Sequence, residues 1–463
     1  MSPAGAFAPA YAGADGVSSH PGVVRAVRRP TGAGVRPVRV LSLAVLGMAL
    51  GNLGRAPVIV RGPEWPVVFN DLLVAVALAA CALACLQARR LRVDAVAGVA
   101  LAFAAVGVGA GMWAAQKYAI GVGELLGSYA YLGRWLGYFG LYVGVLNVAR
   151  DDDAPALWSA VERMVLAVAA FGVVQVFAFE HFAQTVYPQG PDYIRWDYQG
   201  RRLVSTLLDP NFAGILIAFP LLVYVAQLSF GVRVRAWKPA LLLAGLLLTV
   251  SRGAVLAFCV GVLVVVAARG VRTRLARAAG VLALAVLPFL PALVGFALSF
   301  KKFSIDESAM ARVQSWLRAL TVIADNPVVG VGFNTYRYVR RAYGWAVADN
   351  LPAGGLDGGL LFVTVLTGFV GLALYIALLG ILVARCRRLW RDPYAPPESR
   401  AFALGTAAAV VALVLHSVTV NSLLLPYLME PLWLMAGIVY LHVRARRRAA
   451  APAGRPGVLA HGR

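Results

Sequence analysis

Residues 239–268 read PALLLAGLLLTVSRGAVLAFCVGVLVVVAA, an apolar run interrupted at Ser251-Arg252-Gly253. As one helix the run would be about 45 Å long, whereas the hydrocarbon core of a bilayer is about 30 Å thick. As two crossings, each half is short. The flanking charge favours two crossings, because this reading puts all the later basic clusters on the cytoplasmic side, as the positive-inside rule requires. Those clusters lie at 269–277, 385–400 and 444–463.

Apolar runs of nearly membrane-spanning length recur throughout the 463 residues, of which 60% are hydrophobic and 14% charged. A soluble protein of this length would have about a quarter of its residues charged. We therefore predict an all-α polytopic membrane protein of about 12 transmembrane helices, with both termini in the cytoplasm. The predicted spans are 38–54, 66–87, 93–115, 129–149, 159–180, 208–229, 239–250, 254–268, 278–298, 358–384, 401–422 and 427–443.

The net charge of +22, from 43 Lys and Arg against 21 Asp and Glu, would suggest nucleic acid on a soluble protein. Here the basic residues flank the spans, where they orient helices and contact anionic membrane lipid, so we expect no nucleic-acid partner. The four cysteines form neither a CxxC pair nor a secreted disulfide framework. The histidines are dispersed and no HExxH is present, so we expect no metal and no soluble cofactor.

The spans divide the chain into a membrane domain at 38–444 and two tails. Residues 1–37 are predicted to be a disordered basic cytoplasmic tail, and 445–463 a second basic cytoplasmic tail. The largest non-apolar block, about 299–357, is predicted to be one large periplasmic loop. Asp151-Asp152-Asp153 follows the fourth span, and we interpret it as a solvated turn and not a metal site.

Several arginines are predicted to lie at the outer face. Arg252 interrupts an apolar run, where an arginine costs about 2.5–3.5 kcal/mol on insertion scales, and Arg134 enters the fourth span near its outer end. Arg312 and Arg318 lie on an amphipathic helix predicted at 310–324. Guanidinium groups pair with phosphate oxygens in a bidentate manner, so this set suits a lipid diphosphate. The alternative is snorkelling at the interface.

Other polar residues near the outer ends of spans are candidates for lining a cavity. They are Asp209 before the sixth span, His416 late in the eleventh and Glu430 early in the twelfth. Hydrogen bonding between helices is the alternative use for His416 and Glu430. Tyrosines and tryptophans between 181 and 207 suit either a sugar-binding surface or an aromatic belt.

Several motifs together resemble the O-antigen ligase and polymerase family of bacterial envelope glycosyltransferases. They are LTVSRGA at 248–254, Arg312-x-x-x-Trp316 running into NPVVGVG at 326–332, and TGFVG at 367–371. RLVSTLLDPN at 202–211 is also similar to the family's entry to its middle spans. The likeness is specific over 200–375. Elsewhere it extends only to span number and hydropathy.

The resemblance implies a transferase that takes a glycan from an undecaprenyl diphosphate carrier at the periplasmic face of the inner membrane. The acceptor would be a sugar hydroxyl on a lipid or on another carrier-linked glycan, in O-antigen, capsule or exopolysaccharide synthesis. The family's diphosphate-binding arginines correspond to Arg252 and Arg312, and less securely to Arg202 and Arg318.

The family's ligases carry a loop histidine with ten residues between it and a glycine. Counting back from Gly368, that position is Asp357. An aspartate can accept the acceptor's hydroxyl proton, so the resemblance implies that Asp357 is the base, with Asp349 in reserve. Asp357 could instead cap the helix that follows it.

From these observations we predict a metal-independent, inverting polysaccharide polymerase or ligase. Because an aspartate stands in place of the ligase histidine, a polymerase fits at least as well as a ligase. The alternatives are a transporter or flippase of lipid-linked glycans, and a protein O-glycan transferase of the same family. A transporter would place its charges nearer the bilayer midplane, often in repeated halves.

Overall fold

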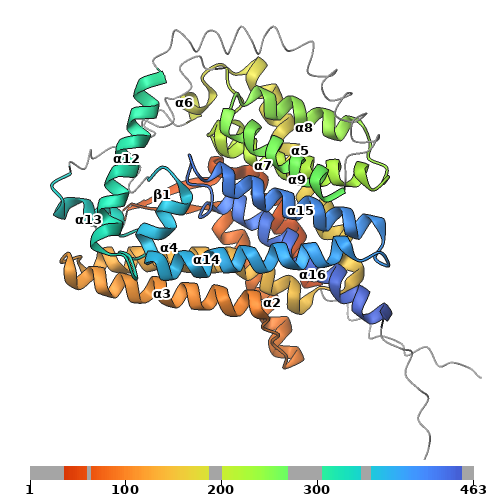
Figure 1. The fold of residues 1–463 in the computed structure, drawn as a ribbon, viewed down its shortest axis with the longest axis horizontal. Coiled ribbons are helices and arrows are strands. Elements are labelled where there is room, and N and C mark those ends of the chain that lie inside the picture. The colour runs from red at the N-terminus through yellow and green to blue at the C-terminus, as the bar shows by residue number, and fades with distance from the viewer. Residues whose placement is uncertain (1–35, 60–63, 187–200, 270–304, 346–355, 451–463) are drawn as a thin grey trace, which may run out of the picture. The chain divides into compact units, whose positions relative to one another are not determined.

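The computed structural model describes residues 36–59, 64–186, 201–269, 305–345 and 356–450; for 55–59, 64–66 and 305–312 it describes only the backbone. This part of the chain is helical apart from one antiparallel pair of strands (Figure 1). Its elements are α1 (Pro37–Gly47), η1 (Met48–Gly54), β1 (Arg55–Ile59), β2 (Glu64–Val68), α2 (Phe69–Ala88), α3 (Ala95–Lys117), α4 (Val122–Val148), η2 (Asp151–Asp153), α5 (Ala154–Ala178), α6 (Phe182–Val186), η4 (Ser205–Leu207), α7 (Pro210–Ser229), α8 (Trp237–Leu248), α9 (Arg252–Arg269), α12 (Ile305–Asp325), α13 (Tyr336–Ala342), α14 (Gly359–Arg391), α15 (Pro397–His416) and α16 (Pro426–Ala450).

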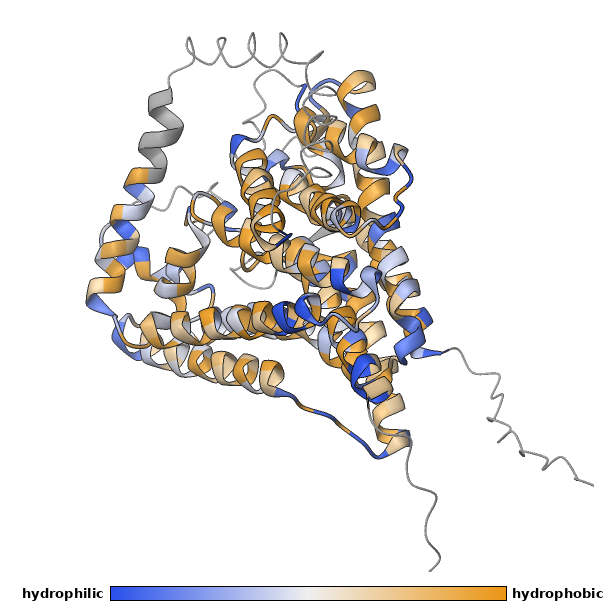
Figure 2. Cartoon of the chain, turned by 45° about the vertical axis from the view of Figure 1, so that its right-hand side comes forward, coloured by the Kyte–Doolittle hydropathy of each residue, from blue (hydrophilic) through white to orange (hydrophobic). Residues whose placement is uncertain are grey.

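The prediction of a helical membrane protein is confirmed. Eight described helices are long and apolar enough to cross a membrane, and α8 is a shorter apolar helix. Figure 2 shows apolar residues along the lengths of these helices, with hydrophilic residues gathered mainly at their ends. Neither α4 nor α16 is among the eight. The number twelve stays a prediction, and the predicted span at 278–298 lies outside the described residues.

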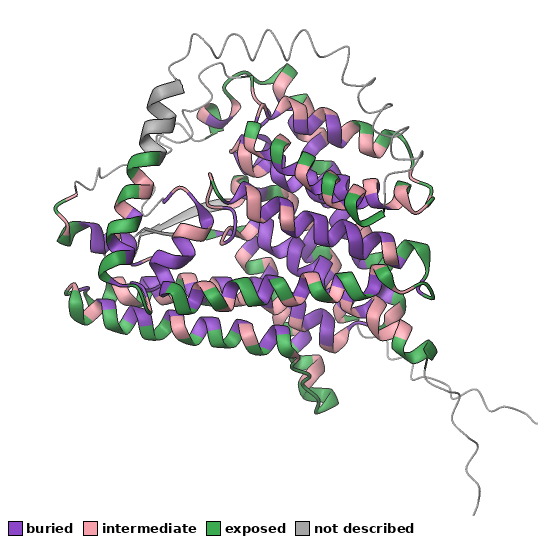
Figure 3. Cartoon of the chain, viewed as in Figure 1, coloured by how far each residue is buried: buried purple, intermediate pink, exposed green. Residues whose placement is uncertain are grey.

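The distribution of exposed residues is that of an integral membrane protein. Only 22% of the apolar window of α2 is buried, against 78% of that of α15. Large apolar side chains of α2, such as Leu72, Leu83 and Leu86, are exposed, and Figure 3 shows the contrast between outer and central helices. A soluble protein rarely leaves so much contiguous apolar surface in water, whereas lipid solvates it.

The short hairpin was not predicted. Its strands pair Arg55 with Val68 and Ile59 with Glu64, so the second predicted span begins at Phe69 and not at residue 66. Each strand is five residues long and contains a proline, Pro57 or Pro66. Such strands give no alternation strong enough to be separated from the neighbouring apolar spans.

The apolar run that opened the sequence analysis forms two helices. α8 ends at Leu248 and α9 begins at Arg252, with Val250 between them at a φ of 54°. A β-branched residue rarely adopts this left-handed conformation, so the neighbouring contacts hold it there. One of these contacts is backbone to backbone: Leu203 N–H donates to Leu248 O at 2.9 Å.

Ion pairs join helix ends that the two-crossing reading places on the same side. Arg385 of α14 binds Asp94, the N-cap of α3, at 2.7 Å, and Arg444 of α16 binds Asp151. Asp94 and Asp151 precede the run at 239–268, and their partners follow it. Since the two residues of a pair lie on the same side of the membrane, the chain must cross the membrane an even number of times between them. Two crossings in 239–268, together with the predicted span at 278–298, give an even number.

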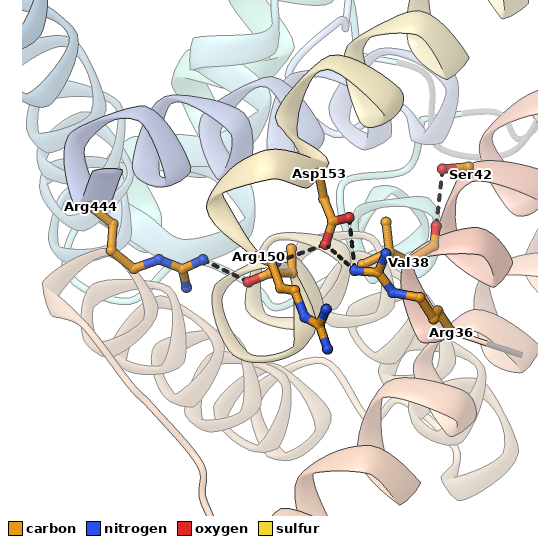
Figure 4. Close-up of polar contacts among 7 residues, drawn as sticks. Arg36, Val38, Ser42, Arg150, Asp153 and Arg444 are labelled. Carbon is orange, nitrogen blue, oxygen red and sulfur yellow. Dashed lines mark hydrogen bonds and ion pairs between the residues drawn. The ribbon is translucent and has the colours of Figure 1, made fainter. Parts of the chain in front are cut away.

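The interpretation of Asp151-Asp152-Asp153 as a solvated turn was wrong for Asp151 and Asp153, whereas Asp152 is exposed. Asp153 is 6% exposed; it binds the Arg36 guanidinium at 3.0 Å and accepts the Arg150 N–H at 2.8 Å (Figure 4). Asp151 binds both Arg444 and Arg448. The acidic turn therefore ties α1 and α16 to the start of α5.

The NPVVGVG motif docks into a break in α14. Gly368 has a φ of 63° and a ψ of −169°, a conformation that essentially only glycine adopts. The break leaves backbone groups without helical partners, and the motif satisfies several of them. Val331 and Gly332 donate their N–H groups to Val365 O and Leu366 O at 2.9 and 2.7 Å, and Phe369 N–H donates to Pro327 O at 2.8 Å.

The same motif is also fixed to α3. A Cβ added at Gly332 would lie 2.5 Å from the Cα of Gly111, so the two backbones approach as closely as glycines allow. Asn326 donates to the Tyr118 hydroxyl at 2.7 Å and accepts from Lys117 at 3.0 Å. The C-terminal end of α12 is thereby held against both α3 and α14.

We predict that Gly368→Ala lowers the free energy of unfolding by at least about 2 kcal/mol, because a Cβ at this φ is strained and would lie 2.1 Å from Val328 O. Gly380 is the control on the same helix, since a Cβ there meets nothing within 4 Å. Thermal unfolding of both variants in detergent measures the difference. Equal stability of the two would contradict the docked break.

Candidate functional site

Four segments that are distant in the sequence meet beside the break between α8 and α9. We call them the polar junction: residues 249–253, 315–316, 357–359 and 416–422. A Cβ added at Gly253 would lie 3.5 Å from His416 Cδ2, and Gly359 N–H donates to Ser417 O at 2.5 Å. The connection after α15 therefore contacts both the start of α9 and the start of α14.

Ser251 organises the break by a pair of hydrogen bonds. Its hydroxyl donates to Asn211 Oδ1 on α7 at 2.8 Å and accepts the Ala254 N–H at 3.3 Å. Thr249 adds a third bond, because its Oγ1 accepts the Ser251 N–H at 3.2 Å. The first turn of α9 is therefore closed by a serine side chain, and Arg252 is its first residue. Arg252 is exposed.

Arg202 and Asp209 have structural contacts near the break. The Arg202 guanidinium donates to Thr249 O at 3.0 Å and to Val250 O at 3.4 Å, so it satisfies carbonyl groups at the end of α8. Asp209 is the N-cap of α7 and accepts N–H groups from Asn211 and Phe212. The diphosphate role of Arg202 and the cavity role of Asp209 stay predictions.

Asp357 does not cap α14. The N-cap of this helix is Gly358, at a φ of 94°, and it makes no side-chain cap bond. The Asp357 N–H donates to Ser315 Oγ on α12 at 3.2 Å, and a Cβ at Gly358 would lie 3.3 Å from Trp316 Nε1. The N-cap position therefore belongs to Gly358, and Asp357 lies at the contact between α12 and α14.

His416 is buried at the end of α15. Its Nδ1 is 2.6 Å from Ser422 Oγ, and within the described part of the chain its Nε2 has no hydrogen-bond partner. The ring edge that carries Nε2 lies nearest Gly253, since a Cβ there would be 3.8 Å from this atom. This nitrogen can donate a hydrogen bond to, or accept one from, a group that enters beside Gly253.

The other predicted phosphate ligands lie along or near α12. This helix confirms the one predicted at 310–324, with Val313, Leu317 and Leu320 exposed on one side. The Arg318 guanidinium lies over the Trp345 ring at 5.6 Å. The side chain of Arg312 and all of Asp349 lie outside the described residues.

Arg134 and Glu430 belong to a separate network among α2, α4 and α16. Arg134 binds Asp71 at 2.6 Å, and the Tyr138 hydroxyl donates to the same carboxylate at 2.9 Å. Glu430 is fully buried and accepts from Asn70 Nδ2 at 2.5 Å. Glu430 therefore makes the helix-to-helix hydrogen bond that was its alternative use.

Sequence reasoning assigned no role to Ser315, Ser417 or Ser422. Serine gives no specific signal in a membrane protein, because isolated hydroxyls bond to their own helix. The spacing of Ser315 from Arg312, three residues on one helix, was the only available cue.

The comparison with family models agrees with this geometry. Residues 239–376 match the family model described as O-antigen ligase, which confirms the resemblance that the motifs in this region carry. That family acts on lipid-linked glycans, and the match suggests a glycosyltransferase-like enzyme. No curated protein matches the chain.

We predict that Ser251→Ala costs about 1–3 kcal/mol of stability, because it leaves Asn211 Oδ1 and the Ala254 N–H without a buried partner. Ser229→Ala is the control, since that hydroxyl makes one bond, to Ala226 O at 2.7 Å, near the end of α7. We expect the control to change stability by less than about 0.5 kcal/mol. Unfolding midpoints in detergent compare the two, and equal shifts would mean that Ser251 does not organise the break.

Proposed function

We propose that the protein transfers a glycan from undecaprenyl diphosphate to a sugar hydroxyl at the periplasmic face of the bacterial inner membrane, as a polysaccharide polymerase or ligase. One observation carries the proposal. The matched region, 239–376, contains both Arg252 and Asp357, and the connection after α15 contacts the helix starts beside both of them. Residues separated by about one hundred positions thus belong to one polar junction.

In the proposed reaction Asp357 accepts the proton of the acceptor hydroxyl, whose oxygen attacks the anomeric carbon of the donor sugar. The bond from that carbon to the diphosphate oxygen breaks, and undecaprenyl diphosphate leaves with the bonding electrons. Arg252 and Arg312 stabilise the charge that develops on it. Single displacement inverts the anomeric carbon, and the neutralised diphosphate is a sufficient leaving group.

The start of α9 supports the diphosphate assignment. The first turn of a helix carries a partial positive charge, and Arg252 adds a full one at the same place. Two further features suit a sugar. The Tyr343 and Trp345 rings stack with centroids 4.7 Å apart, and Arg318 lies beside them. Flat aromatic faces of this kind can pack against pyranose rings.

We expect Asp357→Asn to leave the protein folded and to lower glycan transfer by about 100-fold or more, because an amide cannot accept the hydroxyl proton. Asp392→Asn is the control at the far end of α14, where Asp392 binds Arg446 at 2.9 Å. The measurement is transfer from purified carrier-linked glycan. An active Asp357→Asn enzyme would refute the assignment, and loss of transfer in Asp349→Asn alone would move the base to Asp349.

We expect Arg252→Lys and Arg312→Lys to fold and insert normally but to lose most of their transfer activity, because lysine keeps the charge and loses the two-pronged contact with phosphate. Arg201→Lys is the matched control, since its exposed ion pair with Glu180 contributes little. Turnover assays and binding of the carrier diphosphate test both variants. Normal turnover by either one removes that arginine from the mechanism, and carrier transport without transfer would favour the flippase alternative.

A further inference from the structure

A cavity of about 400 Å³ opens between the ends of α2, α4 and α16, and none of its lining residues belongs to the polar junction. Five arginines line it, and its other walls are largely apolar, with Ala84, Cys85 and Val148 among them. No carboxylate is among the lining residues. We call it the basic cavity and define it by Arg90, Arg92, Arg150, Arg444 and Arg448.

The five arginines differ in whether their side chains form ion pairs. Asp151 holds Arg444 and Arg448, and Arg444 also donates to Ala149 O at 2.7 Å. Within the described residues, the side chains of Arg90, Arg92 and Arg150 make no ion pair. Figure 4 shows that the Arg150 backbone N–H, and not its guanidinium, binds Asp153.

The walls of the basic cavity are fixed by hydrogen bonds. Asn147 at the end of α4 accepts the Arg92 N–H at 2.6 Å and donates to Arg92 O at 3.1 Å. The connection that carries Arg90 and Arg92 is thus attached to α4. The backbone at Arg92 is therefore fixed beside the cavity that these arginines line.

The position of the cavity indicates the source of the anion. It lies where α2 ends at Ala88 and α4 ends at Val148, the level at which apolar helices meet lipid headgroups. Leu83 and Leu86 on α2 are 57% and 74% exposed beside it. If the arginines hold the phosphate of a phospholipid, the acyl chains of that lipid would lie along this apolar surface.

The two terminal segments offer little negative charge that could balance the basic cavity. Residues 1–35 contain a single acidic side chain, Asp15, and residues 451–463 contain none. Both segments have a net positive charge, so neither offers a charge complementary to the basic cavity.

We propose that the basic cavity binds the phosphodiester headgroup of an anionic membrane phospholipid, with Arg90, Arg92 and Arg150 as its phosphate contacts. Arg444 and Arg448, held by Asp151, add positive potential behind them. Such a lipid would join α2, α4 and α16, so it contributes to stability independently of the glycan transfer proposed above.

The test uses the full-length protein in phosphatidylcholine nanodiscs with and without about one fifth phosphatidylglycerol. We expect phosphatidylglycerol to raise the unfolding temperature of the wild type. Arg90→Gln with Arg92→Gln should weaken the response to phosphatidylglycerol by about 10-fold or more in the concentration required, since each arginine near a lipid surface contributes about fivefold. Arg387→Gln with Arg388→Gln is the control, because both arginines are exposed on α14 and do not line the cavity.

Three results would overturn the proposal. Equal responses of the two double variants would mean that only general surface charge matters. Inorganic phosphate that stabilises the wild type as well as phosphatidylglycerol does would make this a free-anion site. If the first double variant does not fold, Arg150→Gln alone takes its place, and an unchanged lipid response there refutes the assignment.

Discussion

The two helix breaks described above, after α8 and at Gly368, lie among apolar helices, where an unpaired N–H or C=O has no water to bind. The architecture follows from this constraint. The break at Gly368 is closed by the backbone of the NPVVGVG motif, which reaches α14 from the end of α12. The break after α8 is closed differently, by the Arg202 guanidinium and by the Ser251 hydroxyl. The irregular backbone at both breaks is thus held by hydrogen bonds from other segments of the chain.

The ends of the helices follow a second rule, set by electrostatics. Carboxylates at helix starts, such as Asp94 and Asp153, bind arginines from helices far along the chain. A half-buried pair of this kind contributes modestly to stability, because desolvation opposes the attraction. Its larger effect is on register, since a helix shifted by one turn would separate the charges by about 5 Å. These pairs therefore fix which helix ends lie together, and the basic cavity lies in the same layer.

The helices were predictable and their partners were not. Length, apolar composition and the Ser251-Arg252-Gly253 interruption were enough to locate α8 and α9, because hydropathy is a local property. Gly368 also stood out in the sequence, as part of TGFVG. Nothing local, however, indicated that Pro327 and Val331 would bind its broken backbone, since pairing depends on segments brought together by the whole fold. Asp357 was found from family spacing, and its place beside Ser315, one residue before the N-cap, needed coordinates.

The contacts of Asn326 with Lys117 and Tyr118 attach the C-terminal end of α12 to α3. Ten residues separate Asn326 from Trp316, a helical length of about 15 Å. A tilt of α12 by about 10° around Asn326 would move Trp316 by about 2.5 Å. Asn326 itself would hardly move. The Asp357 N–H donates a hydrogen bond to Ser315 Oγ on the same helix. The angle of a helix whose apolar stripe is exposed is therefore coupled to the position of Asp357, through the hydrogen bond from the Asp357 N–H to Ser315 Oγ.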